Sequence, residues 1–129
     1  MAMLLWVYDC EGKDRLNSLE ELKWQNRVFI IDNANAKIIK ELRSHKSGIE
    51  ERHVYWFCVV GDAVETNYPG DVGNGFIKHL KTDYFGKYGH PVILIGKDGG
   101  VKSKDGKLNI IDYFGQIDEM PMRQSEMRE

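Results

Sequence analysis

The residues that say most about the fold are Pro91-Val92-Ile93-Leu94-Ile95-Gly96-Lys97-Asp98-Gly99-Gly100-Val101-Lys102. Its first half is a short apolar run that follows a proline, which is typical of a buried strand. The pair Asp98-Gly99 is a strong turn signal, and a strand-like pattern resumes at Val101. A tight turn of this kind joins antiparallel strands, so the stretch predicts a β-hairpin.

Two apolar runs upstream of the hairpin predict further strands. Residues 27–32 (RVFIID) and 53–60 (HVYWFCVV) are rich in β-branched and aromatic residues, which favours strands covered on both faces. Asn33 or Asn35 can cap a helix between them, with Gly48 as its natural stop. That helix is predicted from apolar residues at helical spacing, namely Ile38, Ile39, Leu42 and Ile49.

The rest of the chain predicts a loop and two more helices. Residues 61–73 are polar and are expected to form a loop, after which Asn74 opens a helix that Gly86 and Gly89 close. Asn109 caps the last helix, and Pro121 breaks it. The side chains of that helix expected to face the core are Ile110, Ile111, Phe114 and Ile117.

The predicted order is strand, helix, strand, helix, hairpin, helix. The first two strands are then parallel and joined by a right-handed crossover, while the hairpin makes the sheet mixed. Ser18 and Glu21 fit a capping box at the start of a short helix. The sequence therefore predicts an α/β domain over residues 24–129, preceded by an N-terminal arm or strand and a short helix over residues 1–23.

Two runs in the last third of the chain carry a family resemblance. LIGKDGGVK at residues 94–102 and IDEMPMRQSEM at residues 117–127 resemble the signature of family 4174 of domains of unknown function. That family includes bacterial proteins and relatives of sushi-repeat and coiled-coil-containing matrix proteins. The resemblance covers roughly residues 24–127 and implies a thioredoxin-like three-layer fold with a mixed central sheet, in the order β-α-β-α-β-β-α. It also implies an exported or periplasmic location.

Composition excludes several classes of protein. The chain has 129 residues and a formal net charge of −2, so it lacks the basic character expected of a nucleic-acid binder. No apolar run approaches the roughly 20 residues that a membrane-spanning helix needs. The apolar residues 3–8 lack the basic start and cleavage site of a signal peptide, so we expect none in this chain.

The family resemblance places the working thiols of a thioredoxin where the first core strand meets its helix. Here that junction, residues 32–36, reads DNANA and contains no cysteine. Dithiol exchange needs two thiols, so this reaction is excluded at that position. Cys10 could act elsewhere, but Asp9 and Glu11 beside it oppose thiolate formation. Cys58 lies in an apolar run and is expected to be a buried free thiol.

The resemblance also suggests a candidate groove. His90-Pro91 occupies the position of the cis-proline that precedes the third core strand in thioredoxin-like proteins, so we predict a cis bond at Pro91. The candidate binding residues of this groove are Asn33, Asn35, His90 and Pro91.

The C-terminal run gives a second candidate, a surface for a protein partner. Its residues, together with two lysines of the hairpin, are Lys97, Lys102, Asp118, Met122, Arg123 and Glu126. Exposed methionines suit adaptable recognition, and an arginine suits an ion-pair anchor. The alternative is a tail folded over the sheet, in which Met120 and Met122 fill gaps and Arg123 pairs with Asp118 or Glu126.

No metal or cofactor site is expected. The four histidines, at positions 45, 53, 79 and 90, show no zinc-site spacing, and no glycine-rich run ends as a phosphate loop does. The function that fits best is a non-redox binding or interaction module rather than an enzyme. The alternative is a thiol-dependent peroxidase or reductase that works through Cys10.

Overall fold

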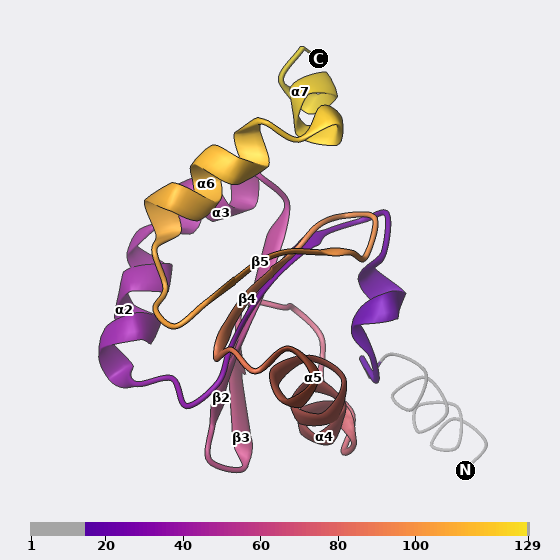
Figure 1. The fold of residues 1–129 in the computed structure, drawn as a ribbon, viewed down its shortest axis with the longest axis vertical. Coiled ribbons are helices and arrows are strands. Elements are labelled where there is room, and N and C mark those ends of the chain that lie inside the picture. The colour runs from indigo at the N-terminus through magenta and orange to yellow at the C-terminus, as the bar shows by residue number, and fades with distance from the viewer. Residues whose placement is uncertain (1–14, 129) are drawn as a thin grey trace, which may run out of the picture.

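The computed structural model describes residues 15–128, which form a five-stranded mixed sheet with helices on both faces (Figure 1). The strand order is β3-β2-β1-β4-β5. β1 and β2 are parallel, and every other neighbouring pair is antiparallel. The strands are β1 (Arg27–Ile31), β2 (Val54–Val60), β3 (Ala63–Thr66), β4 (Val92–Ile95) and β5 (Val101–Asp105).

Helices form the two outer layers. α2 (Ala36–Ser44), α3 (Lys46–Glu51) and α6 (Ile110–Asp118) cover one face of the sheet. The other face is covered by the 3₁₀ helix η1 (Leu19–Leu22) and by a helix made of α4 (Phe76–Leu80), the π-helical segment η2 (Lys81–Phe85) and α5 (Gly86–Tyr88). α7 (Pro121–Arg128) follows α6 at the end of the molecule. The predicted three-layer α/β fold with a mixed sheet is confirmed.

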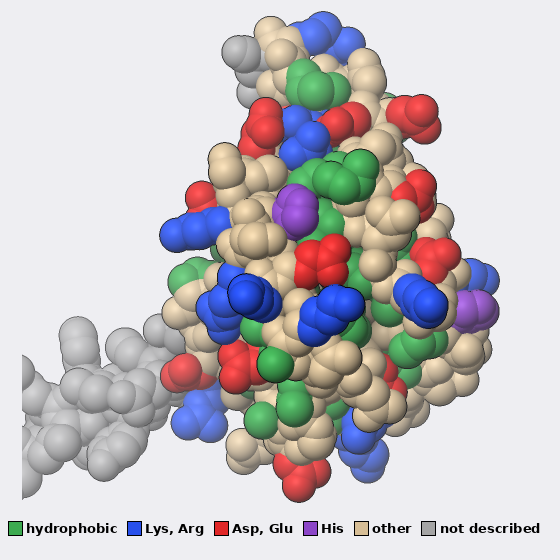
Figure 2. Space-filling view, turned by 90° about the vertical axis from the view of Figure 1, so that its left-hand side faces the viewer, with side chains coloured by type: hydrophobic (Ala, Val, Ile, Leu, Met, Phe, Trp, Pro, Cys, Tyr) green, Lys and Arg blue, Asp and Glu red, His purple; other side chains and the backbone are tan. Residues whose placement is uncertain are grey.

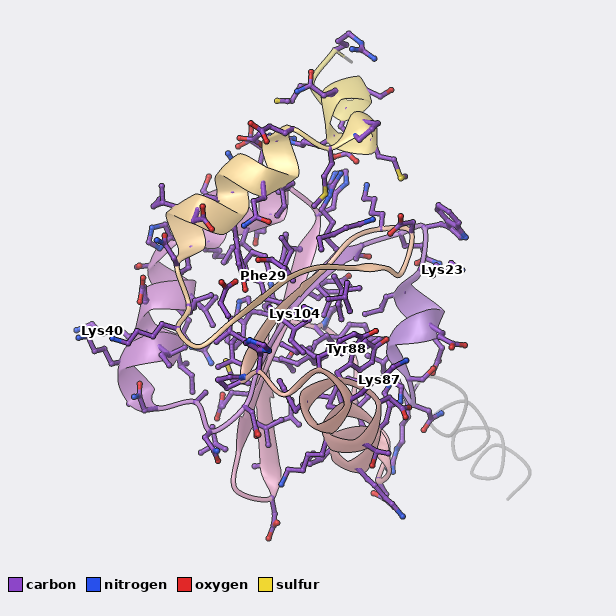
Figure 3. All side chains as sticks on the ribbon, in the orientation of Figure 1. Lys23, Phe29, Lys40, Lys87, Tyr88 and Lys104 are labelled. Carbon is purple, nitrogen blue, oxygen red and sulfur yellow. The ribbon has the colours of Figure 1, made fainter. Side chains whose placement is uncertain are left out.

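Two hydrophobic cores result from the alternation of side chains along β1. Phe29 and Ile31 face α2, α3 and α6, whereas Val28 and Ile30 face η1 and α4. Phe29 lies between the sheet and α6, and its ring is 5.4 Å from that of Tyr113 (Figure 3). All five residues of β1 are buried, as the prediction of a strand covered on both faces requires.

The loop predicted over residues 61–73 is wrong in its first part. The chain turns at Gly61, whose φ is +61°, and returns along β2 as the edge strand β3. β3 is short and only partly buried. This strand is not recognisable from the sequence, because an edge strand with one face in water does not need an apolar run.

The predicted stop at Gly48 is also wrong. The first helix ends at Ser44 and a second begins at Lys46, so Gly48 lies inside α3. A Cβ atom at Gly48 would lie 2.8 Å from Cε2 of Phe114 on α6. This glycine therefore allows α3 and α6 to approach each other closely rather than ending a helix.

The helix before β4 continues to Tyr88 and ends at Gly89, whose φ is +70°. It begins at Phe76 after Gly75, not at Asn74, and it passes through Gly86. Within this helix Gly89 alone acts as the predicted C-terminal glycine, because the left-handed backbone there favours a residue without Cβ.

The hairpin and the starts of helices α2 and α6 largely match the predictions made from the sequence. β4 and β5 pair antiparallel, although Gly96 N–H donates to Gly100 O at 2.9 Å, which makes the turn longer than two residues. Asn35 and Asn109 accept hydrogen bonds at the starts of α2 and α6 as predicted. Ile111, predicted to be inward, is 66% exposed, and Tyr113 takes the core position instead.

The predicted N-terminal arm and Cys10 lie outside the described residues. Leu16, Leu19 and Leu22 are buried in the core that faces α4. The Glu21 carboxylate accepts the Ser18 N–H at 2.9 Å, which is one half of the predicted capping box. Each helix among residues 15–128 is too short or too polar to span a lipid bilayer.

Candidate functional site

The junction between β1 and α2 lies beside Pro91, as predicted. Asp32 N–H donates to Pro91 O at 2.8 Å, and Asn33 follows with a φ of +52°. The polar groups here serve the backbone: Asn35 Oδ1 accepts from Ile38 N–H at 2.9 Å, and His90 Nδ1 lies 2.8 Å from Tyr88 O. The four candidate groove residues therefore form a structured turn region.

The predicted cis bond at Pro91 is wrong, because none of the described residues follows a cis peptide bond. Pro91 still precedes β4, where a trans proline suits the entry to a strand. The expectation came from the family resemblance alone, and no local sequence signal at His90-Pro91 distinguishes the two isomers.

Cys58 is the thiol that the structure places next to this junction. It lies opposite Ile31 in the parallel pairing of β1 and β2 and is fully buried, as predicted. Burial, together with the carboxylate of Glu65, raises the pKa of Cys58 to about 12, although Arg43 opposes the shift. The thiol is therefore protonated at neutral pH rather than present as the reactive thiolate.

The second set of predicted residues surrounds α7. Glu126 binds the fully buried Arg27, with Nη2 3.1 Å from Oε2, and the ammonium group of Lys97 at 2.6 Å. The Lys97 Nζ atom also lies 2.7 Å from His53 Nδ1. The start of β1, the β4–β5 turn and the last helix are thus tied together at one end of the sheet.

A second ion-pair group lies beside the first. Asp118, near the end of α6, accepts hydrogen bonds from Arg52 at 3.0 and 3.1 Å and from Arg123 Nε at 3.0 Å. Arg123 also lies 3.4 Å from Glu51. The predicted pairing of Arg123 with Asp118 is confirmed, and the C-terminal segment is folded against the body of the domain.

These contacts lower the pKa of both acidic groups, Glu126 and Asp118. Burial alone would raise the pKa of Glu126, but hydrogen bonds from Arg27 and Lys97 and their charges outweigh it and lower that pKa. The hydrogen bonds from Arg52 lower the pKa of Asp118 most and outweigh the opposing effect of burial, and the hydrogen bond from Arg123 and both positive charges lower it further. Both carboxylates are therefore ionised at neutral pH.

An apolar cavity of about 280 Å³ opens beside this network. Its walls include Trp24, Met120, Pro121 and Met122, with Lys97 and Lys102 at its side. Trp24 is 61% exposed and Met122 40% exposed, so Met122 does not fill a gap as the folded-tail alternative expected. Met120 is partly buried against the core and does so. We call this cavity and its walls the Trp24 surface.

Trp24 is held in an unusual conformation. Its φ is +70°, and its N–H donates to Lys97 O at 2.5 Å. The neighbouring Arg27 lines the same cavity, and its Nε atom is buried without a hydrogen-bond partner among the described residues. Sequence reasoning missed Trp24 and Arg27. The available signal was a tryptophan between the polar residues Lys23 and Gln25.

The structure thus describes a small three-layer α/β domain whose C-terminal helix is ion-paired to one end of the sheet. The chain matches a family described as a domain of unknown function, DUF4174, over residues 18–126. Because this match covers most of the chain, the protein belongs to that family. No curated protein and no solved structure matches the chain.

Proposed function

We propose that this domain is a thioredoxin-like, non-redox binding module for a protein partner. Three features support the thioredoxin-like assignment: β1 and β2 are parallel, β4 lies antiparallel beside β1, and helix α6 follows the β4–β5 hairpin. The absence of cysteine from residues 32–36 supports a role without dithiol chemistry. The protonated, buried Cys58 beside this junction supports the same conclusion.

The observation that carries the proposal is the exposure of Trp24 on a wall of an apolar cavity. Tryptophan is enriched among the residues that dominate the binding energy of protein interfaces. Here the backbone N–H of Trp24 is bound by Lys97 O, so the main chain that carries the ring is already ordered before a partner binds. Met122 next to it adds an apolar side chain that adapts to its partner.

The charges around the Trp24 surface indicate the partner's chemistry. Lys23, whose Nζ is 5.4 Å from the Trp24 ring, projects from the side of the molecule (Figure 3). Lys97 and Lys102 line the cavity, but Lys97 is paired with Glu126 at 2.6 Å and Lys102 with Asp98 at 2.8 Å. Lys23 is therefore the cation that supports a partner segment with an apolar anchor side chain and an acidic neighbour.

A capture experiment tests this proposal. The immobilised protein is incubated with an extract of its source organism, and bound proteins are quantified for wild type, Trp24→Gly and Ile111→Ser. Ile111 is the matched control, because it is equally exposed but lies on α6. We expect Trp24→Gly to capture at least about tenfold less of its partners than the wild type, which is the loss typical of a binding hot spot. Ile111→Ser should capture as much as the wild type. Equal capture by all three proteins would contradict the proposal.

A further inference from the structure

The outer edge of β2 is only partly covered by β3. The pairing with β3 runs from Phe57 to Val60, whereas β2 itself begins at Val54. Along Val54–Trp56 no strand of the described chain pairs with that edge. Uncovered strand edges present backbone N–H and C=O groups that need partners.

One side chain takes the place of the missing strand. Asn67, which follows β3, accepts a hydrogen bond from Trp56 N–H through Oδ1 at 2.8 Å. Its Nδ2 donates to Val54 O at 3.2 Å. A carboxamide carries the same acceptor and donor as a peptide group. Asn67 therefore satisfies residues i and i+2 of the strand, as one residue of a neighbouring strand does.

A cavity of about 630 Å³ lies along the same edge. Its apolar lining includes Leu42 and Ile49 from the helices and Trp56 from β2, while Asn67 and Pro69 lie among its other walls. Leu42, Ile49 and Trp56 are buried beneath the surface of this cavity, so an extended segment that enters it lies over them, against the backbone edge of Val54–Trp56 and the exposed Pro69.

The exposed rim of this cavity carries more positive than negative charge. Arg43 and Lys46 are its formal cations, and Glu50 is its formal anion. Figure 2 shows a band of Lys and Arg side chains across the side of the molecule that carries α2. The ion pairs of Arg43 with Glu65 and of Lys46 with Glu50 are largely exposed, so they hold these cations only weakly.

We propose that this cavity binds an extended, acidic peptide segment of a partner, which adds to β2 as a strand and displaces the Asn67 carboxamide. Strand addition draws affinity from main-chain hydrogen bonds and specificity from alternate side chains. The residues involved differ from those of the Trp24 surface, so this site stands independently of the proposed function.

The test uses an end-blocked hexapeptide that alternates valine with aspartate, titrated into the protein and followed by NMR. We expect shifts of the Trp56 backbone amide and of the Asn67 side-chain amide. Asn67→Ala removes the two competing hydrogen bonds of the carboxamide, and affinity should rise about thirtyfold, which corresponds to two net hydrogen bonds. Trp24→Gly should leave the affinity unchanged.

Two matched peptides and one surface variant complete the experiment. A peptide with an N-methyl group on every residue can donate no backbone hydrogen bond along either edge and should not bind. A peptide with lysine in place of aspartate should bind the wild-type protein several-fold more weakly. The acidic peptide should bind the Lys46→Glu variant several-fold more weakly than the wild type. If Asn67→Ala fails to fold, the N-methylated peptide and Lys46→Glu decide the question with the wild-type edge intact. Absence of shifts at Trp56 at millimolar peptide, or equal binding of the N-methylated peptide, would overturn the proposal.

Discussion

Glu126 and Arg27 face each other through two parallel hydrogen bonds, Nη1 to Oε1 at 3.2 Å and Nη2 to Oε2 at 3.1 Å. They are 99 residues apart in the chain, so the pair ties the last helix to the first strand of the sheet. Lys97 shares the same carboxylate. One acidic side chain thus balances two buried cations at the base of the Trp24 surface.

Removal of the Glu126 charge should destabilise the protein strongly. Glu126→Gln leaves Arg27 and Lys97 buried without a counter-charge, so we expect a loss of about 3 kcal/mol in the free energy of unfolding, measured with urea. The matched control is Glu65→Gln, which removes the exposed pair with Arg43 and should cost less than about 1 kcal/mol. A loss for Glu126→Gln no larger than that of the control would contradict the assignment.

The same pair makes stability depend on pH in the acid range. The pKa of Glu126 is lowered in the folded state, so its contribution is complete above the unfolded-state pKa of 4.5. It is lost as the pH falls below 4.5 and through the lower folded-state pKa. Urea unfolding between pH 7 and pH 3 should therefore show a steeper loss for the wild type than for Glu126→Gln. Parallel curves for the two proteins would contradict this linkage.

Two helical glycines should respond oppositely to alanine. Gly48→Ala places a methyl group 2.8 Å from Phe114 and should destabilise the protein by about 1–3 kcal/mol despite the better helix propensity of alanine. Gly115→Ala meets no atom within 4 Å on α6 and should stabilise it by up to about 1 kcal/mol. Thermal unfolding of both variants measures this difference. A stabilising Gly48→Ala would show that α3 and α6 are not closely packed there.

Some elements of the fold could be predicted from the sequence and others could not. Apolar runs identified β1, β2 and β4, because buried strands leave a continuous signal. Gly48 resembles a helix stop in the sequence, since its packing role depends on Phe114, which is distant in sequence. β3 resembles a loop in the sequence, because Glu65 and Thr66 make it polar. Ile111 and Tyr113 exchanged roles because both fit an amphipathic pattern within one helical turn.

Trp24 should be dispensable for folding. An L-residue with a φ of +70° is strained, and glycine adopts that conformation freely. Trp24→Gly should therefore keep the free energy of unfolding unchanged or raise it by up to about 1 kcal/mol. Urea unfolding checks this value before the capture experiment. A loss of more than about 2 kcal/mol would show that Trp24 serves the fold rather than a partner.

Cys58 should be inert in the folded protein. Because burial raises its pKa to about 12, a thiol reagent at pH 8 should not modify Cys58 in the variant Cys10→Ser. Addition of urea should make one thiol reactive, and the rate should follow unfolding. Rapid modification of the native variant would contradict the buried position of this thiol.

The candidate site was predictable only in part. The C-terminal run identified Arg123, Asp118 and Glu126, because charged residues beside a helix break suggest ion pairs. Arg27 could not be identified from the sequence. It precedes an apolar run, as an exposed residue at the start of a strand does, and only the fold shows that Glu126 lies opposite it. The exposure of Trp24 likewise depends on a left-handed backbone that no local residue pattern requires.

Binding without thiol chemistry is tested by comparing the wild type with the cysteine-free variant Cys10→Ser/Cys58→Ala. Each protein is assayed for retention of the captured partners and for disulfide reductase and peroxidase turnover. We predict retention within about twofold of the wild type, against the tenfold change of a hot-spot loss, and no turnover by either protein. Loss of retention in the cysteine-free protein, or turnover by the wild type that Cys10→Ala alone abolishes, would contradict a non-redox binding role.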